Sequence, residues 1–364
     1  MMSRYVVVGG FLGAGKTTTL MAISSYLEQM GKKAAILVND LGAKNLVDGS
    51  FTGTSGFVTE EITGGCICYQ TENLVDKLRR FRDVHQADLI LSDIPGCGIG
   101  GLDHVYHKLT EEYPEEVVLA PFTAVADPER LRVIMPEQAD LHLPKEMEYL
   151  FDAQLREAEV IVLNKTDLLT EEEKEQILKF LRENYSTAKV FAISAKEGTG
   201  IAELSDYLME TESQVPVREI GYGGPEFLAA EEKMSWYNRQ CYLTSEEEFD
   251  GNQFLESFFD AVRGGLRAIG RNVPHLKAMG ETAEGDMAKV SLLGVDYPVQ
   301  FDRRLKDSCL RLRVIVNARA VCESETLDNL MDIALKETAK AFGLSLRVFF
   351  TECFGMMDDG FDEA

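Results

Sequence analysis

Short apolar runs alternate with amphipathic stretches through the first part of the chain. Residues 4–10 centre on a continuous apolar run, which is typical of a strand buried on both faces of a sheet. An amphipathic helix is predicted next, ending at Gly31, with four apolar residues on one face: Leu20, Ile23, Leu27 and Met30. Further strands are predicted at residues 34–38, 89–91, 117–120, 160–163 and 189–193. Strands that alternate with helices predict a mostly parallel sheet covered on both faces.

The pattern changes at residues 211–235, where prolines and glycines cluster and predict a linker. Residues 236–355 predict a smaller α+β domain with helices on one face of a small sheet. Its helices are expected near 252–269 and before Gly343, and its extended segments near 238–243, 287–301, 312–316 and 344–350. The last residues, 356–364, form an acidic tail that we expect to be disordered. The chain is therefore predicted to be α/β over residues 1–210, followed by this smaller α+β domain.

Composition and charge narrow the class of protein. An apolar content of 45% and a charged content of 27% are ordinary for a globular protein. No apolar run reaches membrane-spanning length and the first residues do not resemble a secretory leader, so a cytoplasmic protein is expected. The 61 acidic and 37 basic residues give a formal charge of −24, which repels phosphate backbones and anionic lipid. Nucleic acid and membranes are therefore not expected partners.

A glycine-rich phosphate-binding motif lies between the first predicted strand and the first predicted helix. The pattern Gly-x-x-x-x-Gly-Lys-Thr occupies residues 10–17. Its glycines let successive backbone N–H groups turn towards phosphates, and the helix N-terminus adds a positive end. Lys16 is expected to reach the β- and γ-phosphates, and the Thr17 hydroxyl to ligate Mg²⁺. The predicted phosphate contacts are Gly10, Gly13, Ala14, Gly15, Lys16, Thr17 and Thr18. This motif makes residues 1–210 a predicted P-loop NTPase domain.

Two carboxylates follow predicted strands and are candidates for the metal shell and for catalysis. Asp93 opens the sequence Asp-Ile-Pro-Gly after the strand at 89–91, so it is expected to meet Mg²⁺, and the Gly96 N–H to contact the γ-phosphate. Asp40 ends the strand at 34–38 and is a second candidate for the metal shell or for the attacking water, unless it caps a turn. Lys16, Asp93 and Asp40 are the predicted catalytic residues.

A second motif, Asn-Lys-Thr-Asp at residues 164–167, follows the strand at 160–163 and predicts guanine. A carboxylate at Asp167 can accept hydrogen bonds from the N1–H and the exocyclic amine of guanine, and adenine offers no such pair of donors. Asn164 and Lys165 complete this predicted base site. Ser194, Ala195 and Lys196 follow the next strand, where a backbone N–H can meet guanine O6. Together the motifs predict GTP and GDP as ligands.

These residues resemble the CobW family of P-loop GTPases, which is related to the HypB and UreG metal-insertion GTPases. The resemblance covers residues 4–210 and rests on the phosphate motif, Asn39-Asp40, Gly-Gly-Cys-Ile-Cys at 64–68 and Asn-Lys-Thr-Asp at 164–167. It implies a metallochaperone or cofactor-maturation role in which hydrolysis controls the release of a metal or a client. This chain departs from the family pattern in three ways. Tyr69 replaces a third cysteine, Asp93 replaces a glutamate, and the His-rich stretch is absent.

Cysteines near the loop at Gly96, the switch segment that is expected to move with the γ-phosphate, suggest a metal site with a different set of ligands. Cys97 directly follows Gly96, and Cys66 and Cys68 precede it in the chain. Three thiolates suit Zn²⁺ or another borderline-soft ion such as Co²⁺. We therefore hypothesise a site of Cys66, Cys68 and Cys97 that ties metal occupancy to the nucleotide state; the alternative is that these are buried small residues without a ligand role. The other four of the seven cysteines are expected to be core residues.

The resulting prediction is a GTPase whose intrinsic turnover is slow, because no arginine finger is identifiable. A client or the formation of a homodimer is expected to accelerate this turnover. Two functions remain open. One is a metallochaperone that delivers Zn²⁺ or Co²⁺ to a client metalloenzyme. The other is a metal-independent GTPase that remodels a cofactor-dependent client, for instance a corrinoid protein, with the smaller domain as docking surface. A kinase that uses the same phosphate loop is disfavoured by residues 164–167.

Overall fold

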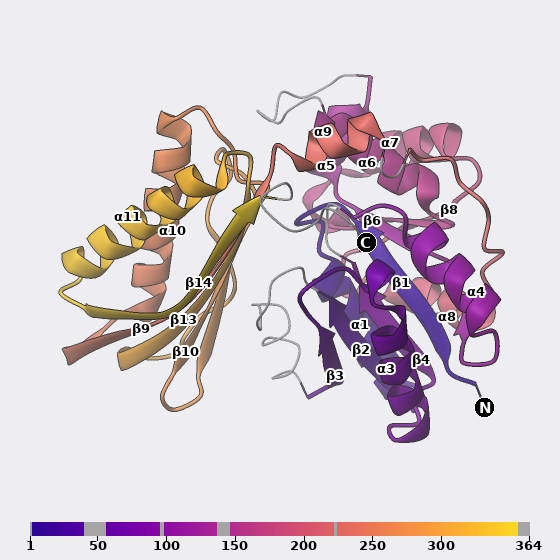
Figure 1. Ribbon diagram of the computed structural model, residues 1–364, viewed down its shortest axis with the longest axis horizontal. Coiled ribbons are helices and arrows are strands. Elements are labelled where there is room, and N and C mark those ends of the chain that lie inside the picture. Colours follow the sequence, from indigo (N-terminus) through magenta and orange to yellow (C-terminus); the bar gives the residue numbers. More distant parts are fainter. Residues whose placement is uncertain (1, 40–55, 95–97, 137–145, 222–223, 356–364) are drawn as a thin grey trace. The chain divides into compact units, whose positions relative to one another are not determined.

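The computed structural model describes residues 2–39, 56–94, 98–136, 146–221 and 224–355 (Figure 1). The chain divides into two compact units, with the boundary between Phe227 and Leu228, and each unit is described by itself. The residues proposed as a linker, 211–235, include the short helix α9 (Pro225–Glu231).

The first unit alternates strands with helices. Its strands are β1 (Arg4–Gly10), β2 (Ala34–Asn39), β3 (Val58–Ile62), β4 (Leu89–Asp93), β5 (Val118–Leu119), β6 (Thr123–Ala126), β7 (Val160–Leu163) and β8 (Lys189–Ala192). Its helices are α1 (Lys16–Gln29), α3 (Thr71–Asp83), α4 (Lys108–Glu112), α5 (Pro128–Ile134), α6 (Glu146–Glu157), α7 (Glu171–Asn184) and α8 (Ile201–Glu210). Three shorter turns of helix are η1 (Ile67–Tyr69), η2 (Leu102–His107) and η3 (Thr166–Leu168).

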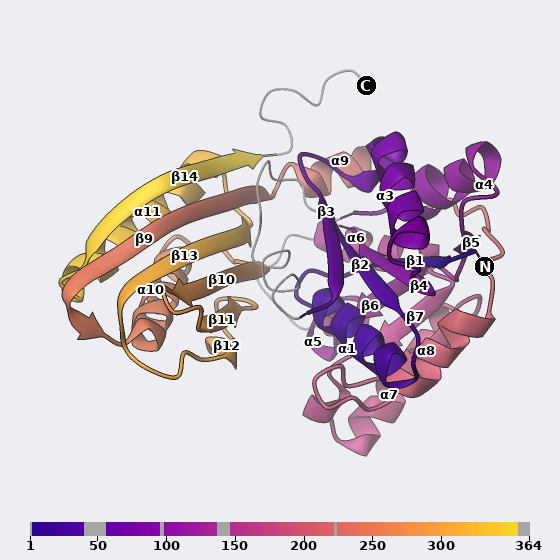
Figure 2. The ribbon, with the colours of Figure 1, turned by 90° about the horizontal axis from the view of Figure 1, so that it is seen from below.

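In the described part of the first unit the strands form one sheet in the order β3-β2-β4-β1-β6-β7-β8, and β5 pairs with the start of β1. Every neighbouring pair is parallel. Helices lie on both faces, as Figure 2 shows. Because parallel strands end at the same edge, the carboxyl ends of β1, β2, β4 and β7 lie along one rim of the sheet. The predicted α/β fold with a mostly parallel sheet is confirmed.

The sequence pattern located most of these strands but misplaced one. The run at 117–120 was predicted to be a sheet strand, yet only Val118 and Leu119 pair, and they pair with the first two residues of β1. The strand that continues the sheet is β6, which pairs with the end of β1 from Val8 to Gly10. Pro121 lies between the two runs and has no N–H to donate to a ladder, so one continuous strand cannot form there.

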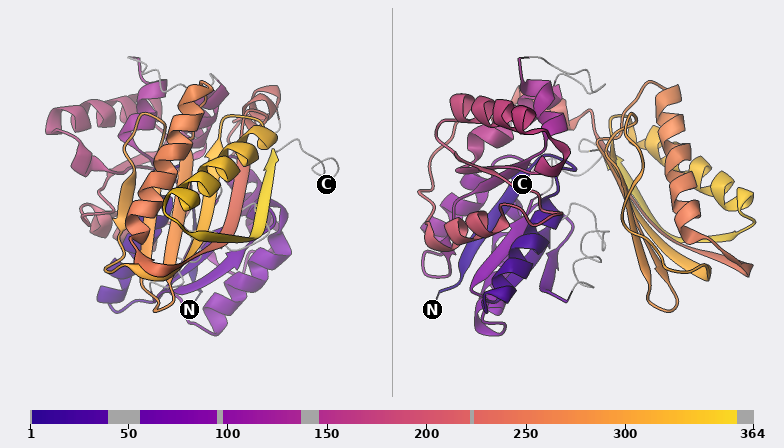
Figure 3. Two further views of the ribbon diagram at one scale, coloured as in Figure 1. Left: turned by 90° about the vertical axis from the view of Figure 1, so that its left-hand side faces the viewer. Right: turned by 180° about the vertical axis from the view of Figure 1, so that it is seen from behind.

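The second unit contains six strands and two long helices in its described residues: β9 (Ser235–Phe249), β10 (His275–Thr282), β11 (Met287–Leu292), β12 (Gln300–Arg303), β13 (Cys309–Ala320), β14 (Ser345–Gly355), α10 (Gly251–Ala268) and α11 (Ser324–Ala341). The strand order is β12-β11-β10-β13-β9-β14, and every neighbouring pair is antiparallel. Both helices lie on one face of this sheet (Figure 3, left). The predicted α+β domain with helices on one face is confirmed.

The core of the second unit lies between that helical layer and the sheet. Helix α10 contributes its aromatic stripe, with Phe254, Phe258 and Phe259 fully buried, and α11 contributes Met331 and Leu335. Alternate residues of each strand face this core, so the intervening residues face the opposite, helix-free side of the sheet. Within the described part of the chain, no helix has the length and apolarity that crossing a lipid bilayer requires.

The packing of α11 gives a direct test of this core. Replacing the fully buried Leu335 with alanine should lower the free energy of unfolding of the second unit by about 2–5 kcal/mol, because buried methyl groups are lost and a cavity remains. Urea denaturation followed by the fluorescence of Trp236, the only tryptophan of the chain, would report on this unit. Ile333→Ala on the same helix is the matched control, since Ile333 is 63% exposed. Equal losses in both variants would contradict the described packing.

Candidate functional site

The glycine-rich loop joins β1 to α1 at the rim of the parallel sheet. Gly10, Gly13 and Gly15 have φ values of 109°, 74° and 94°, the left-handed region that favours glycine. A Cβ on Gly10 would lie 2.2 Å from the carbonyl oxygen of Val125, and one on Gly15 would lie 2.4 Å from Asn164 Nδ2. Glycine is therefore required at both positions by conformation and by space.

The residues that follow the loop begin α1. Lys16 Nζ donates to the carbonyl oxygens of Gly10 at 2.9 Å and of Phe11 at 3.1 Å, so its ammonium lies against the loop. Thr17 is 5% exposed in the first turn of α1, whereas Thr18 is exposed. Ala14 is fully buried. The structure thus brings the predicted phosphate contacts together around one helix N-terminus, with Thr18 directed to solvent.

The Asn-Lys-Thr-Asp segment is tied to this loop through hydrogen bonds. Asn164 Nδ2 donates to the carbonyl oxygen of Ala14 at 2.8 Å, and Asn164 Oδ1 accepts from the Ala195 N–H at 3.0 Å. Lys165 Nζ donates to the carbonyl oxygen of Gly13 at 2.7 Å. Asn164, which is 3% exposed, therefore joins three loops that the sequence places far apart.

Asp167 and the segment after β8 lie side by side. Ser194 Oγ donates to Asp167 Oδ1 at 2.6 Å, and the Glu197 N–H donates to Ser194 Oγ at 3.1 Å. The side chain of Lys196 is 80% exposed and lies 3.8 Å from a carboxylate oxygen of Glu197. A carboxylate, a hydroxyl and the backbone of this segment are therefore gathered at one place on the rim.

Asp93 ends β4, directly beside β1, where it is in register with Val8. It is 7% exposed, and its Oδ1 accepts from the backbone N–H of Asn39 at 2.9 Å. The side chain of Asn39 is in turn hydrogen-bonded to the loop that carries the cysteines. Its Nδ2 donates to the carbonyl oxygens of Ile62 at 3.1 Å and Gly65 at 2.8 Å, and its Oδ1 accepts from the Ile67 N–H at 3.0 Å. One buried asparagine thus connects Asp93 with both sides of Cys66.

The two cysteines of that loop face each other. Their Sγ atoms are 2.8 Å apart, and the Cys68 N–H donates to Cys66 Sγ at 3.4 Å. The hydrogen bond with Cys66, followed by burial, raises the pKa of the Cys68 thiol well above its usual range. Tyr69, in the place of a third cysteine, is 58% exposed, and its ring centroid lies 6.1 Å from that of His104. Among the described residues no three His, Cys, Asp or Glu side chains lie close enough to hold a metal ion together.

Three predicted site residues, Asp40, Gly96 and Cys97, lie outside the described residues. The chain is described again from Gly98, where α6 contacts it. Gln154 Nε2 donates to the carbonyl oxygen of Gly98 at 3.2 Å. Glu157 accepts from the N–H groups of Gly100 at 3.0 Å and Leu102 at 2.8 Å, at the start of η2. This carboxylate, 1% exposed, holds the chain that follows the predicted switch segment.

Sequence reasoning gave no role to Asn39, Gln154 or Glu157. Asn39 carried a weak signal, because it is a polar residue that ends an apolar strand next to a candidate acid. Glu157 also carried a weak signal, because it is a charged residue at the end of an amphipathic stretch, shortly before the apolar run of β7. Their partners lie 23 to 57 residues away in sequence, and no local pattern predicts such contacts.

A glycine-rich loop between a parallel strand and a helix, followed by Lys16 and Thr17 and braced by Asn164, defines the P-loop class of nucleotide-binding domains. Comparison with known proteins specifies the class further. The family model for the CobW/HypB/UreG nucleotide-binding domain matches residues 4–192, just over half of the chain. The chain belongs to this family, which confirms the resemblance seen in its motifs.

Curated relatives cover the same region. The zinc chaperone YeiR of Escherichia coli is 29% identical over 189 residues, which are 50% of this chain and 52% of that protein. The GPN-loop GTPase PAB0955 of Pyrococcus abyssi is 30% identical over 59% of this chain and 88% of its own. The Zn(II)-bound YjiA GTPase from E. coli, a solved structure, is 16% identical with a TM-score of 0.39 and covers 92% of this chain and 99% of its own. The match to YeiR thus spans about half of each protein.

The buried carboxylate of Glu157 gives a prediction about pH. Burial raises its pKa from 4.5 to about 7, although the N–H groups of Leu102 and Gly100 act in the opposite direction. A group whose pKa is higher in the folded state contributes stability at low pH, and this contribution is lost as the pH rises through about 7. Relative to Glu157→Gln, the wild-type unfolding free energy should therefore fall between pH 5 and 8, by roughly 3 kcal/mol for a shift of this size.

Urea denaturation followed by far-ultraviolet circular dichroism would measure this difference, with Trp236 fluorescence separating the transition of the second unit. The glutamine cannot titrate, but its amide N–H faces one of the two backbone N–H groups that Glu157 accepts from, so a constant offset between the proteins is expected. The informative quantity is the slope with pH. A difference that stays flat across this range would contradict the assignment.

Proposed function

We propose that this protein is a GTP-hydrolysing metallochaperone whose nucleotide cycle controls a thiolate metal site at Cys66 and Cys68. The observation that carries the proposal is the position of Asn39, which is hydrogen-bonded to Asp93 through its backbone and to both sides of Cys66 through its side chain. Family membership supports a nucleotide-dependent role, and the zinc chaperones among the relatives support a metal as cargo.

The residues present fit a nucleotide with Mg²⁺. Lys16 Nζ lies against loop carbonyls, and phosphate oxygens are stronger, charged acceptors for the same ammonium. Thr17 and Asp93 are the proposed Mg²⁺ ligands, because a hydroxyl beside the phosphates and a carboxylate on the adjacent strand suit a hard ion. The ion would neutralise charge on the transferred phosphoryl group. Asp40 and Gly96 stay proposals for the attacking water and for the γ-phosphate contact.

The proposed guanine site consists of Asp167 with the backbone after β8. The carboxylate accepts hydrogen bonds from the N1–H and the amine of guanine, and the Ala195 N–H, which Asn164 positions, lies in the segment expected to meet O6. Ser194 holds one Asp167 oxygen, which fixes the orientation of the carboxylate. Lys165 would lie along the nucleotide while it braces Gly13.

The cysteine pair is suited to a soft or borderline metal as cargo. Two thiolates bound to a tetrahedral Zn²⁺ at about 2.3 Å lie about 3.8 Å apart, so the Sγ atoms must separate by about 1 Å from their present 2.8 Å. Because the pKa of Cys68 is raised, an incoming cation must displace a proton, and affinity should increase with pH. Cys97 remains the proposed third ligand. Hydrolysis would move Asp93 and its neighbours, and Asn39 would transmit this movement to the cysteine loop.

The coupling can be measured as Zn²⁺ affinity with GDP and with a non-hydrolysable GTP analogue. Wild type should bind Zn²⁺ with affinities that differ between the two nucleotides, and Cys66→Ser/Cys68→Ser should lose most of the binding. Asn39→Asp keeps an acceptor for the Ile67 N–H but removes the donor to Ile62 and Gly65, so Zn²⁺ binding should survive with less nucleotide dependence. Unchanged affinity in the cysteine variant would reject the site. It would favour the metal-independent GTPase that remodels a cofactor-dependent client.

Base recognition is tested separately at Asp167. Asp167→Asn replaces one acceptor with a donor, so affinity for GDP should fall roughly 10- to 100-fold, the loss expected for a hydrogen bond to a charged group. Xanthosine diphosphate, which presents an oxygen where guanine has an amine, should gain affinity. Lys196→Ala is the control, because that side chain is 80% exposed and only its backbone is proposed to act. Equal losses in both variants, measured by isothermal titration calorimetry, would contradict the assignment.

A further inference from the structure

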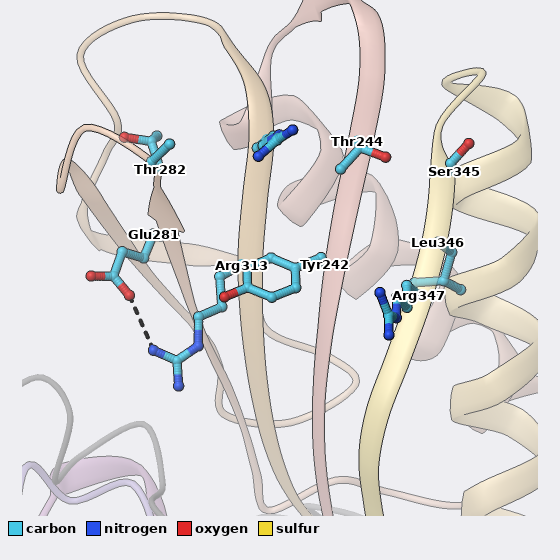
Figure 4. Close-up of a pocket in the computed structure, with 10 residues that line it drawn as sticks. Tyr242, Thr244, Glu281, Thr282, Arg313, Ser345, Leu346 and Arg347 are labelled. Carbon is cyan, nitrogen blue, oxygen red and sulfur yellow. Dashed lines mark hydrogen bonds and ion pairs between the residues drawn. The ribbon is translucent and has the colours of Figure 1, made fainter.

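The helix-free face of the second unit carries a groove that the proposed GTPase cycle does not use. The groove has a volume of about 590 Å³ and is lined by ten residues: Tyr242, Thr244, Glu281, Thr282, Ala283, Arg311, Arg313, Ser345, Leu346 and Arg347. Figure 4 shows these side chains across four neighbouring strands. All of them belong to the second unit.

Strand register explains why these residues meet. Arg347 on β14 is opposite Tyr242 on β9, Tyr242 is opposite Arg313 on β13, and Arg313 is opposite Glu281 on β10. The next row on the same face joins Ser345, Thr244 and Arg311. The pleat therefore displays two rows of polar side chains on one surface, with three guanidinium groups among them.

The charges in this groove differ in sign from those of the protein as a whole. Arg313 Nη1 lies 3.3 Å from a carboxylate oxygen of Glu281, the one acidic residue that lines the groove, so that pair is neutralised (Figure 4). Arg311 and Arg347 are exposed and have no acidic partner among the described residues. A chain of formal charge −24 thus presents two uncompensated guanidinium groups in one groove. Such a groove attracts carboxylates and repels cations.

An aromatic pair lies beside these arginines. The ring centroids of Tyr242 and Phe349 are 4.7 Å apart, and the two side chains are 42% and 47% exposed. Arg347 lies over the Phe349 ring at 6.0 Å. Exposed tyrosine, phenylalanine and arginine are the residue types that dominate the energetics of protein interfaces. The Thr244 and Ser345 hydroxyls, in the row of Arg311, can donate and accept hydrogen bonds.

We propose that this groove binds an extended acidic peptide segment of a partner protein. Arg311 and Arg347 are two strands apart and two residues apart along the strands, so their backbones lie about 12 Å apart, and carboxylates on alternate residues of an extended peptide lie about 7 Å apart. Arginine side chains can close the difference and bind carboxylates in bidentate fashion. An apolar side chain between two acidic ones would contact Tyr242 and Phe349. The peptide recognition does not depend on nucleotide or metal.

Fluorescence anisotropy with the full chain tests this. The probe is a labelled hexapeptide of alternating glutamate and leucine, and the comparison peptide has glutamine in place of glutamate. Wild type should bind the acidic peptide alone, and Arg311→Ala/Arg347→Ala should weaken binding at least about tenfold. Arg267→Ala/Arg271→Ala changes the net charge equally outside the groove and should leave affinity within about twofold. Nucleotide-free protein should behave identically, which separates this test from that of the GTPase cycle.

A charge-reversal variant provides a second test in case the alanine substitutions alter the sheet. Arg311→Glu/Arg347→Glu should lose the glutamate peptide and gain a lysine–leucine peptide, with unchanged Trp236 fluorescence as evidence of folding. Equal weakening in the control variant, or no binding by wild type at millimolar peptide, would overturn the proposal. Tighter binding of a single-stranded oligonucleotide of the same length would replace the peptide with nucleic acid. Competition by inorganic phosphate at the same concentration as the peptide would reduce the groove to a small-anion site.

Discussion

The close approach of the glycine-rich loop to its neighbours is the constraint on which the site depends. At Gly10 and Gly15 the backbone comes so near to Val125 and Asn164 that no side chain fits. This proximity lets Asn164 hydrogen-bond simultaneously to Ala14 and Ala195. The loop after β1, the segment after β7 and the segment after β8 therefore form one hydrogen-bonded assembly.

Asn39 plays the corresponding role on the other side of β1. The strand order places β2 between β3 and β4, so a residue at the end of β2 lies between the ends of both neighbouring strands. Its backbone contacts Asp93 and its amide spans the loop that contains Cys66. Asp93 and the loop of Cys66 therefore both contact Asn39 because of the strand order, although they are distant in sequence. The proposed coupling between nucleotide and metal follows from that topology.

Sequence alone predicted features that depend on local spacing. The glycine loop, Asp93, the segment at 164–167 and the apolar stripe of the first helix were located because their signals lie within a few residues of one another. Strand β3 was missed because Glu60 and Glu61 disrupt its apolar pattern; Glu60 is paired with Lys77 and Arg80 of the adjoining helix. The Asn39, Glu157 and groove contacts arise from strands and helices distant in sequence, and no local pattern records them.

Lys165 shows that the conformation of the nucleotide-site loop is fixed by contacts within the domain. Its φ of 61° is unfavourable by about 1–2 kcal/mol for a residue with a side chain, and its ammonium is held on the Gly13 carbonyl at 2.7 Å. The strained residue and its restraint both belong to the domain itself. The conformational entropy of this loop is therefore lost when the domain folds and not when a ligand arrives, so preorganisation leaves more of the binding energy to appear as affinity. A glycine at this position would relax the strain and return that entropic penalty to the binding step.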